Sequence, residues 1–351
     1  MRNTKLLFLS LVICVFFSLG HATGPYRVGT TSGNFLELGF GSAGVAMGDA
    51  YVSVVNDISS VYWNPAGLGY MEKNELTSNI QPWVVDINFS MGAFAYSNPV
   101  LGTFAFSFLN TNYGEEDVTT MDYQEGTGET YTGQDLSLQF SYGRRLAQWF
   151  SFGVTGKYIN SRIWRTSASA FALDFGSIVN TNFLNWTGEP GHGLNIGMSI
   201  SNYGTRLHYD GKNIKERLDP SENEGNYAYV PVKYETGDWE LPLLFRIGVS
   251  FSPILTDHHR LILSTDALHP NNNSEYINVG AQYSLTVNPV GEFYLRSGYK
   301  GLLMDDAPYG ITFGGGLEMN LLDNYGVSFD YAARDMGVFG YLHSYSFGFS
   351  F

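Results

Sequence analysis

The C-terminal stretch from Tyr341 to Phe351 alternates strictly between large and small side chains. Aromatic residues and one histidine occupy every second position: Tyr341, His343, Tyr345, Phe347, Phe349 and Phe351. Leucine, serine and glycine fill the positions between them. This period of two is that of a β-strand, whose successive side chains point to opposite faces. We therefore predict a strand with one aromatic face, which would aggregate at the edge of a soluble sheet but is favourable in lipid.

The same alternation recurs along most of the chain. Further runs begin near Glu75, Ile87, Gly102, Gln134, Trp149, Ser167, Gly193, Leu243, His259, Ile277, Phe293, Ile311 and Tyr325. With the C-terminal run they make about 14 strands of roughly 9–12 residues, the length that crosses a bilayer at the tilt of barrel strands. The pattern predicts an all-β transmembrane protein, with an antiparallel outer-membrane β-barrel over residues 74–351.

The connections between these runs fall into two classes. Short turns are expected at 98–100, 146–148 and 322–324, whereas two long acidic segments occupy 111–133 and 204–240. Short periplasmic turns and long outer loops are the asymmetry of a transmembrane barrel. The 13-residue segment 180–192 is an exception on the short side. It is either an elaborated periplasmic turn or an error in the predicted register.

The first 22 residues have the parts of a secretory signal peptide. Arg2 and Lys5 precede an apolar run over residues 6–19, with small residues at positions 20 and 22. This run is shorter than the roughly 20 residues of a membrane-spanning helix. Cys14 is the sole cysteine, and Ile13 before it is not the small residue that lipoprotein cleavage requires. We expect residues 1–22 to direct export to the outer membrane of a Gram-negative-type bacterium, leaving a mature chain without disulfides.

Composition agrees with a barrel and excludes some partners. Charged residues make up 15 % and aromatic residues 16 % of the chain, which also has 41 glycines. Without Arg2 and Lys5, the 19 basic residues fall to 17 against 33 acidic ones, a net charge of about −16. This balance argues against a nucleic-acid partner.

Residues 39–69 are neither strand-like nor turn-like. Their first half is rich in glycine and alanine and contains a formal GxGxxG over 39–44, with Asp57 eighteen residues after its first glycine. A dinucleotide site would need a βαβ unit around this motif, and the chain offers none. Gly44 and Gly48 instead form a GxxxG step suited to close helix packing. Asn64 is a predicted cap with Pro65 at the first helical position.

The run GSAGVAMGDAYVSVVNDISSVYWNPAGL, residues 41–68, resembles the N-terminal segment of the FadL superfamily of outer-membrane proteins, most closely its PorV/PorQ branch. The resemblance implies a 14-stranded barrel occluded by an N-terminal hatch, or plug, here residues 23–73 and called the hatch segment below. The hatch residues that it implies are Gly41, Gly44, Gly48, Asp57, Asn64, Pro65 and Gly67. The C-terminal strand resembles the signal by which the barrel-assembly machinery recognises such proteins, and this assigns a membrane-insertion role to Tyr345, Phe347, Phe349 and Phe351.

The resemblance implies two functions. FadL-type members pass long-chain fatty acids or other hydrophobic small molecules through the hatch and a lateral gap, in contact with outer-membrane lipid. PorV-type members act with the type IX secretion apparatus and receive exported cargo. The long loops of this chain are acidic and polar and lack an apolar segment for capturing lipid. This favours a PorV/PorQ-type role in secretion-associated binding, with a FadL-like passive channel as the alternative.

Charged residues at predicted inward positions are the remaining candidate site: Lys157, Asp174, Arg246, Asp266, Arg296, Glu318 and Asp330. They either pair with one another and with the hatch segment or line a polar route for a ligand head group. No catalytic constellation can be placed, so we expect neither an enzyme nor a cofactor. The pair His258-His259 lies in a predicted turn without carboxylates at metal-ligand spacing, and we expect it to be exposed rather than metal-bound.

Overall fold

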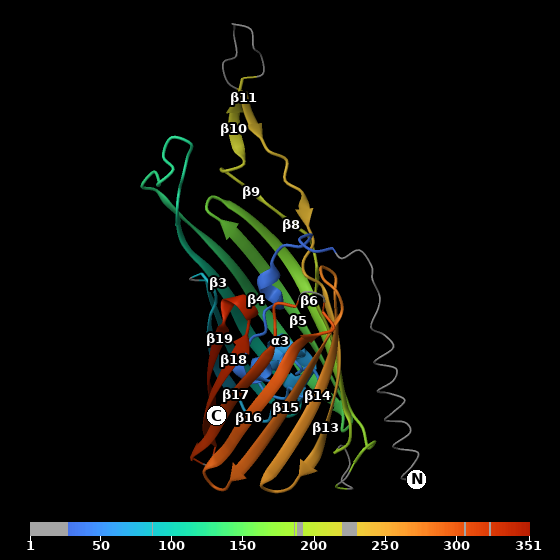
Figure 1. The fold of residues 1–351 in the computed structure, drawn as a ribbon. Helices are drawn as coiled ribbons and strands as arrows, with labels where there is room; N and C mark the ends of the chain where they lie inside the picture. The colour runs from blue at the N-terminus through green and yellow to red at the C-terminus, as the bar shows by residue number, and fades with distance from the viewer. Residues whose placement is uncertain are drawn as a thin grey trace.

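A computed structural model describes residues 27–85, 87–185, 187, 192–219, 230–304, 307–322 and 324–351. The predicted signal peptide lies outside these residues. Within them, fourteen strands form a closed antiparallel barrel around the N-terminal part of the chain (Figure 1). The wall strands are β1 (Glu75–Pro82), β2 (Asn88–Asn98), β3 (Gly102–Asp117), β4 (Thr130–Ala147), β5 (Phe150–Ile163), β6 (Thr166–Asn180), β7 (Asn195–Gly204), β13 (Leu244–Leu255), β14 (His259–Pro270), β15 (Tyr276–Val287), β16 (Gly291–Leu302), β17 (Ile311–Leu322), β18 (Tyr325–Asp335) and β19 (Tyr341–Ser350).

The first and last wall strands close the barrel. β1 pairs with β19 from Glu75 opposite Ser350 to Ile80 opposite Tyr345, and on its other edge with β2. Every wall strand therefore has two partners, and no wall edge is left open to another chain. The predicted fold class, strand count and antiparallel order are confirmed.

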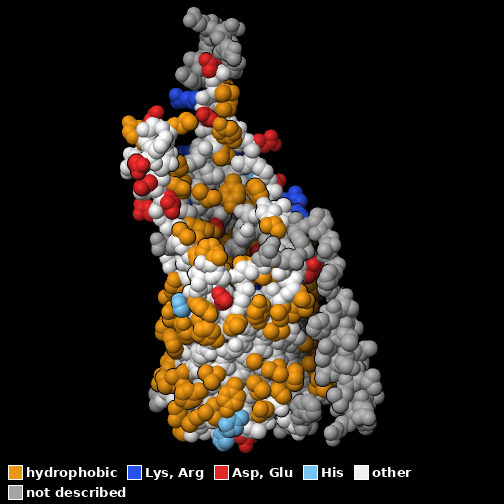
Figure 2. Space-filling model, viewed as in Figure 1, with side chains coloured by type: hydrophobic (Ala, Val, Ile, Leu, Met, Phe, Trp, Pro, Cys, Tyr) orange, Lys and Arg blue, Asp and Glu red, His pale blue; other side chains and the backbone are white. Residues whose placement is uncertain are grey.

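Alternation along the strands separates a lipid-facing surface from the lumen. In β19, Tyr341 and Phe347 are more than half exposed, whereas Ser344 between them is buried. In β6, Phe171 is 65 % exposed and its neighbour Ala172 only 3 %. Figure 2 shows the apolar side chains gathered in a broad band around the lower part of the barrel, with acidic side chains at its upper end. The pattern is that of a barrel with an apolar outer face in lipid.

Four neighbouring strands are longer than expected. β3 to β6 contain 16, 18, 14 and 15 residues instead of roughly 9–12. The predicted loop 111–133 is therefore largely a hairpin that continues β3 and β4, with only 118–129 between the strands. The prediction was wrong because the apolar alternation on the outer face ends at Phe108 and Leu136, while the backbone pairing continues beyond it.

The connections lie as the two-class pattern predicted. The short turns predicted at 98–100 and 146–148 lie at 99–101 and 148–149, at the same end of the barrel as a further short turn at 288–290. The predicted turn 322–324 contains residue 323, which lies outside the described residues. Segment 181–194 joins β6 to β7 at this same end, so it is an elaborated turn and the register was correct. We call this end periplasmic and the other end extracellular.

The described residues of the long connection from β7 to β13 contain five short strands at the extracellular end: β8 (Leu207–His208), β9 (Asp210–Gly211), β10 (Lys215–Leu218), β11 (Val230–Lys233) and β12 (Asp238–Trp239). The β10–β11 hairpin projects farthest from the barrel (Figure 1). No helix among the described residues is long and apolar enough to cross a membrane.

From Asn34 onward the hatch segment lies inside the barrel, and its described residues form four short helices (Figure 1). They are η1 (Asn34–Glu37), α2 (Ser42–Ala46), α3 (Ser60–Trp63) and η2 (Pro65–Tyr70); a further turn, η3 (Gly337–Phe339), joins β18 to β19. Phe40, Met47, Trp63 and Leu68 are almost completely buried between these helices and the wall. The apolar core of the protein is therefore the contact between hatch and barrel.

Candidate functional site

Glycines allow the hatch segment to pack closely. Gly48 has a φ of 66°, and a Cβ there would lie 2.6 Å from the backbone nitrogen of Tyr299 in β16. A Cβ at Gly44 would lie 2.5 Å from the ring of Trp63. At Gly48 the close approach is combined with a left-handed backbone, which only glycine adopts without strain. The arrangement differs from the predicted helical GxxxG face, because α2 ends at Ala46, so Gly44 contacts the hatch itself and Gly48 the wall.

The wall receives the hatch backbone at glycines of its own. The pairs in which an added wall Cβ would overlap the hatch are Gly153 with Pro65, Gly176 with Asn64, Gly197 with Val52 and Gly298 with Met47. These glycines leave room in the lumen. The hatch segment occupies that room.

Asn64 ties the centre of the hatch to the wall. Its Nδ2 donates to the carbonyl oxygens of Val52, at 2.8 Å, and of Ser177 in β6, at 3.1 Å. Its Oδ1 accepts from the backbone N–H of Ala66, with Pro65 in the first turn of η2, as predicted for a cap. The predicted Gly67 donates its N–H to the Asn64 carbonyl, and an added Cβ would strike Ser60. Gly41, with a φ of 87°, precedes α2.

A buried ion triad anchors the hatch on the opposite wall. Asp49, in a left-handed backbone conformation, pairs with Lys300 of β16 at 2.6 Å and with Arg334 of β18. All three residues are at most 4 % exposed. The sequence interpretation missed this triad. The sequence feature that could have indicated it is one acidic residue, Asp49, within the glycine- and alanine-rich first half of residues 39–69.

Two pairs of the predicted inward residues interact with each other. Lys157 and Asp174, from β5 and β6, form a buried ion pair at 2.6 Å, and Lys157 also donates to Asn202 at 2.8 Å. Arg296 and Asp330, from β16 and β18, form a second pair in which Arg296 also donates to Gln282. The two cations and two anions therefore compensate one another's charge on the inner side of the wall.

Two further predicted residues contact the hatch segment. The Arg246 guanidinium lies 5.6 Å from the ring centroid of Tyr62 and 5.9 Å from that of Trp63. The Asp266 carboxylate accepts the backbone N–H of Val52 at 2.9 Å. These six residues therefore pair with one another or contact the hatch segment. A polar route for a ligand head group remains a prediction.

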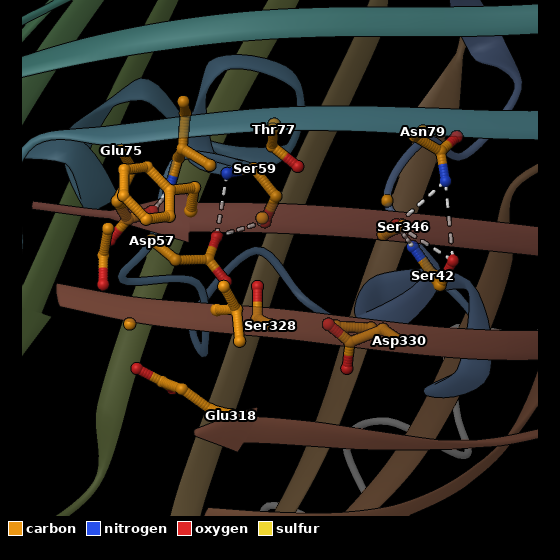
Figure 3. Close-up of a pocket in the computed structure, with 18 of the residues that line it drawn as sticks. Ser42, Asp57, Ser59, Glu75, Thr77, Asn79, Glu318, Ser328, Asp330 and Ser346 are labelled. Atoms are coloured by element: carbon orange, nitrogen blue, oxygen red, sulfur yellow. Dashed lines mark hydrogen bonds between the residues drawn. The ribbon is translucent and has the colours of Figure 1, made fainter. Parts of the chain in front are cut away.

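Two cavities with charged residues in their walls lie between the hatch and the wall near β1, and Figure 3 shows the smaller one. Cavities of about 130 Å³ and about 310 Å³ are both lined by Asp57, Glu75, Tyr294, Arg296 and Glu318. The predicted Asp57 accepts from the backbone N–H of Ser59 at 2.8 Å, and Glu75 accepts from that of Ile58 at 3.1 Å. Glu318 accepts from the Tyr294 hydroxyl at 3.2 Å. No group of three or more His, Cys, Asp or Glu side chains suited to a metal occurs among the described residues.

A second set of cavities opens at the extracellular end. One of about 520 Å³ has aromatic walls formed by Tyr131, Trp164, Tyr209 and Trp239, and no charged residue lines it. A neighbouring cavity of about 430 Å³ shares Tyr131 and Tyr209 with it. Both reach Ser32 of the hatch segment, whose hydroxyl lies 2.7 Å from that of Tyr209. We call these two cavities the vestibule; the sequence interpretation did not identify it, because its walls come from four separate segments.

The N-terminal end of the hatch segment is fixed at this vestibule. Asn272, in the β14–β15 connection, donates to Thr31 at 2.9 Å and to Glu37 at 3.1 Å. Burial raises the pKa of Glu37, and the hydrogen bond from Asn272 offsets part of this effect. The hatch is thus held at the extracellular end as well as at its centre.

The predicted insertion residues lie on the lipid-facing side of β19 and just beyond it. Phe347 packs on Phe329 with ring centroids 5.0 Å apart, and Phe349 stacks on Phe351 at 5.6 Å. Tyr345 packs on Tyr331 at 5.5 Å. A signal role for these aromatic residues remains a prediction.

Solved structures share this fold at low sequence identity. The CymD monoaromatic hydrocarbon channel matches with a TM-score of 0.58 at 10 % identity, covering 89 % of this chain and 97 % of that one. The toluene transporter TodX of Pseudomonas putida matches at 0.56 and 11 %, covering 89 % and 98 %. The toluene transporter TbuX of Ralstonia pickettii matches at 0.54 and 12 %, covering 89 % and 97 %. At these identities the likeness is one of fold, that of FadL-family outer-membrane channels.

The sequence itself also matches a family. No curated protein matches the chain. The family model described as type IX secretion system protein PorV matches residues 21–225, more than half of the 351 residues. Fold and family are those of transport or secretion-associated proteins of the outer membrane. The chain therefore belongs to the PorV family.

Proposed function

We propose that the protein acts in protein export at the outer membrane, as a non-enzymatic barrel that binds exported proteins or secretion-system components at its extracellular end. Membership of the PorV family supports this role. The structural observation that carries the proposal is the way in which the hatch segment is held. A barrel that binds partners outside can keep its hatch in place, whereas a channel must move it.

Moving the hatch would break contacts on several sides of the lumen. Asp49 would leave two buried cations, Asn64 would leave the carbonyl oxygen of Ser177, and Asp266 would lose a backbone donor. Breaking one buried ion pair alone typically costs about 3–5 kcal/mol. Such a hatch suits a barrel that serves as a fixed platform.

The extracellular end offers a surface for a protein partner. The extended β3–β4 hairpin and the β10–β11 hairpin rise on one side of the barrel beyond its rim (Figure 1). The aromatic vestibule lies below them, lined in part by Trp164 and Trp239. Tyrosine and tryptophan are enriched where protein partners bury side chains.

A pull-down from detergent-solubilised outer membranes tests the proposal. The tagged protein should recover exported proteins or secretion components. A variant with residues 212–234 replaced by a short glycine-serine turn should recover several-fold less. A matched control replaces the periplasmic turn 181–194 and should recover as much as the unaltered protein. Empty pull-downs together with normal secretion in a deletion strain would contradict the proposal.

A second candidate is a passive channel for hydrophobic or amphipathic small molecules. The observation that favours it is that the vestibule reaches the hatch at Ser32 from outside, while polar cavities reach it at Asp57 near β1. The structural neighbours are channels and transporters for monoaromatic hydrocarbons and toluene. Uptake of radiolabelled toluene or oleate should then fall in a deletion strain, and unchanged uptake would count against this role.

A further inference from the structure

A groove of about 810 Å³ lies on the outer surface of β3 to β7, away from the lumen. Its walls are side chains that stand out from the barrel, each between 44 % and 65 % exposed: Phe106, Phe140, Phe171, Leu173 and Tyr203. These belong to the lipid-facing set of the alternating pattern. The groove is therefore a hollow in the surface that contacts the membrane.

Gly156 of β5 forms the floor. It lies opposite Phe140 of β4 and Leu173 of β6 in the two strand pairings. A Cβ added at Gly156 would meet no atom within 4 Å, in contrast to the crowded glycines that face the hatch. The groove exists because one position without a side chain is surrounded by large ones.

The wall behind the groove is closed. The register of β4 with β5 runs without interruption from Gly133 to Arg145, and that of β5 with β6 from Phe150 to Ile163. Lys157, next to Gly156, points inward to its ion pair with Asp174. Beside the groove, the register of β6 with β7 shifts between Leu173 and Phe175, and the two strands pair on both sides of this shift. The hollow is thus a surface on the outside of the barrel.

A polar belt limits the groove on its extracellular side. Along each strand, toward the extracellular end, the outward-facing side chains change from apolar to polar one or two outward positions beyond the groove. The belt residues are Asn110, Asn112, Gln134, Asn160, Arg162, Ser167 and Ser169, and the strand registers place them side by side. Outward side chains change in this way where hydrocarbon gives way to head groups. The groove therefore lies at the depth of acyl chains in the outer leaflet.

We propose that this groove binds one acyl chain of a phosphate-bearing lipid of the outer leaflet, with the lipid head group at the belt beside Arg162. The exposed Arg162 supplies the cation of the belt, and its Nε donates to the Trp164 carbonyl at 3.0 Å, which orients the guanidinium. Arginine pairs with phosphate through several N–H donors. The aromatic walls supply dispersion contacts along the chain.

Native mass spectrometry of the full-length protein, purified from outer membranes in mild detergent, tests the proposal. The unaltered protein should retain a phosphorylated, acylated lipid. Gly156→Phe fills the floor and should lower the retained fraction about tenfold, because the chain loses its contacts. Arg162→Gln should lower it several-fold. The matched control, Leu295→Phe, adds an aromatic side chain to a lipid-facing position of β16 that is 69 % exposed and should retain the lipid.

Heat-modifiable migration on gels confirms that each variant is folded before the comparison. Equal retention in Gly156→Phe and the unaltered protein would overturn the site. So would retention of free fatty acid or detergent alone. Lost recovery of a protein partner by Gly156→Phe without any change in lipid would show that the groove is a protein contact instead. The pull-down of the proposed function does not depend on these outcomes.

Discussion

Two buried cations, Lys300 and Arg334, reach the carboxylate of Asp49 from different wall strands. At the residue scale this triad fixes one side of the hatch. Asp49→Asn would leave both cations buried without a counter-charge. We expect the free energy of unfolding to fall by about 3–5 kcal/mol, measured by urea titration of the protein in lipid vesicles. Asp210→Asn removes an exposed partner of Lys233 and should leave the value unchanged; equal loss in both variants would argue against the triad.

Gly48 lies close to the wall backbone, whereas Gly156 has open space beside it. Comparing alanine substitutions at the two positions tests whether the hatch requires glycine for close packing. Gly48→Ala places a Cβ in a left-handed backbone 2.6 Å from Tyr299 and should cost about 1–3 kcal/mol. Gly156→Ala places the same atom in open space and should cost nothing. The same vesicle titration compares them. A tolerated Gly48→Ala would show that the hatch can shift away from β16.

At the element scale, Asn64 joins η2 of the hatch to β6. Asn64→Ala removes the cap, worth about 1 kcal/mol, and removes the side-chain donor to the Val52 and Ser177 carbonyls. Limited proteolysis should then cut within 39–69 several-fold faster than in the unaltered protein. Asn56→Ala, at an exposed hatch position, is the control. Equal cleavage of the two variants would mean that the cap does not hold the hatch.

The sequence predicted the wall strands better than their ends. Runs expected from Glu75, Gly102 and His259 begin at those residues in β1, β3 and β14. The extracellular ends of β3 and β4 were missed, because alternating hydrophobicity reports contact with lipid and the pairing continues past it.

The candidate site could be predicted only in part, because residues that meet in the fold lie far apart in the sequence. Lys157 and Asp174 were correctly placed on the inward face, but their pairing depends on the register between two strands. Asp49 and Arg334 are 285 residues apart. No local pattern brings such residues together, since only barrel closure determines which wall positions face the hatch.

At the scale of the whole molecule, the hatch segment and the wall form one packed body around buried charges. Deleting residues 39–67 should open the lumen and give conductance steps in planar bilayers, whereas the unaltered protein should give none. The deletion removes Asp49 and Asn64 with the core residues Met47 and Trp63. Unchanged conductance after deletion would remove the plug role.

The central claim is that the protein works with its hatch in place. The Ser42 and Ser344 hydroxyls lie 3.0 Å apart, between α2 and β19, so a cysteine at each position is close enough for a disulfide between hatch and wall. Cys14, in the predicted signal peptide, is the sole native cysteine. The direct measurement is the amount of extracellular cargo from a deletion strain carrying Ser42→Cys with Ser344→Cys, oxidised or reduced. A hatch that stays in place during secretion should give equal secretion in both states. Secretion or toluene uptake that only the reduced protein restores would contradict it.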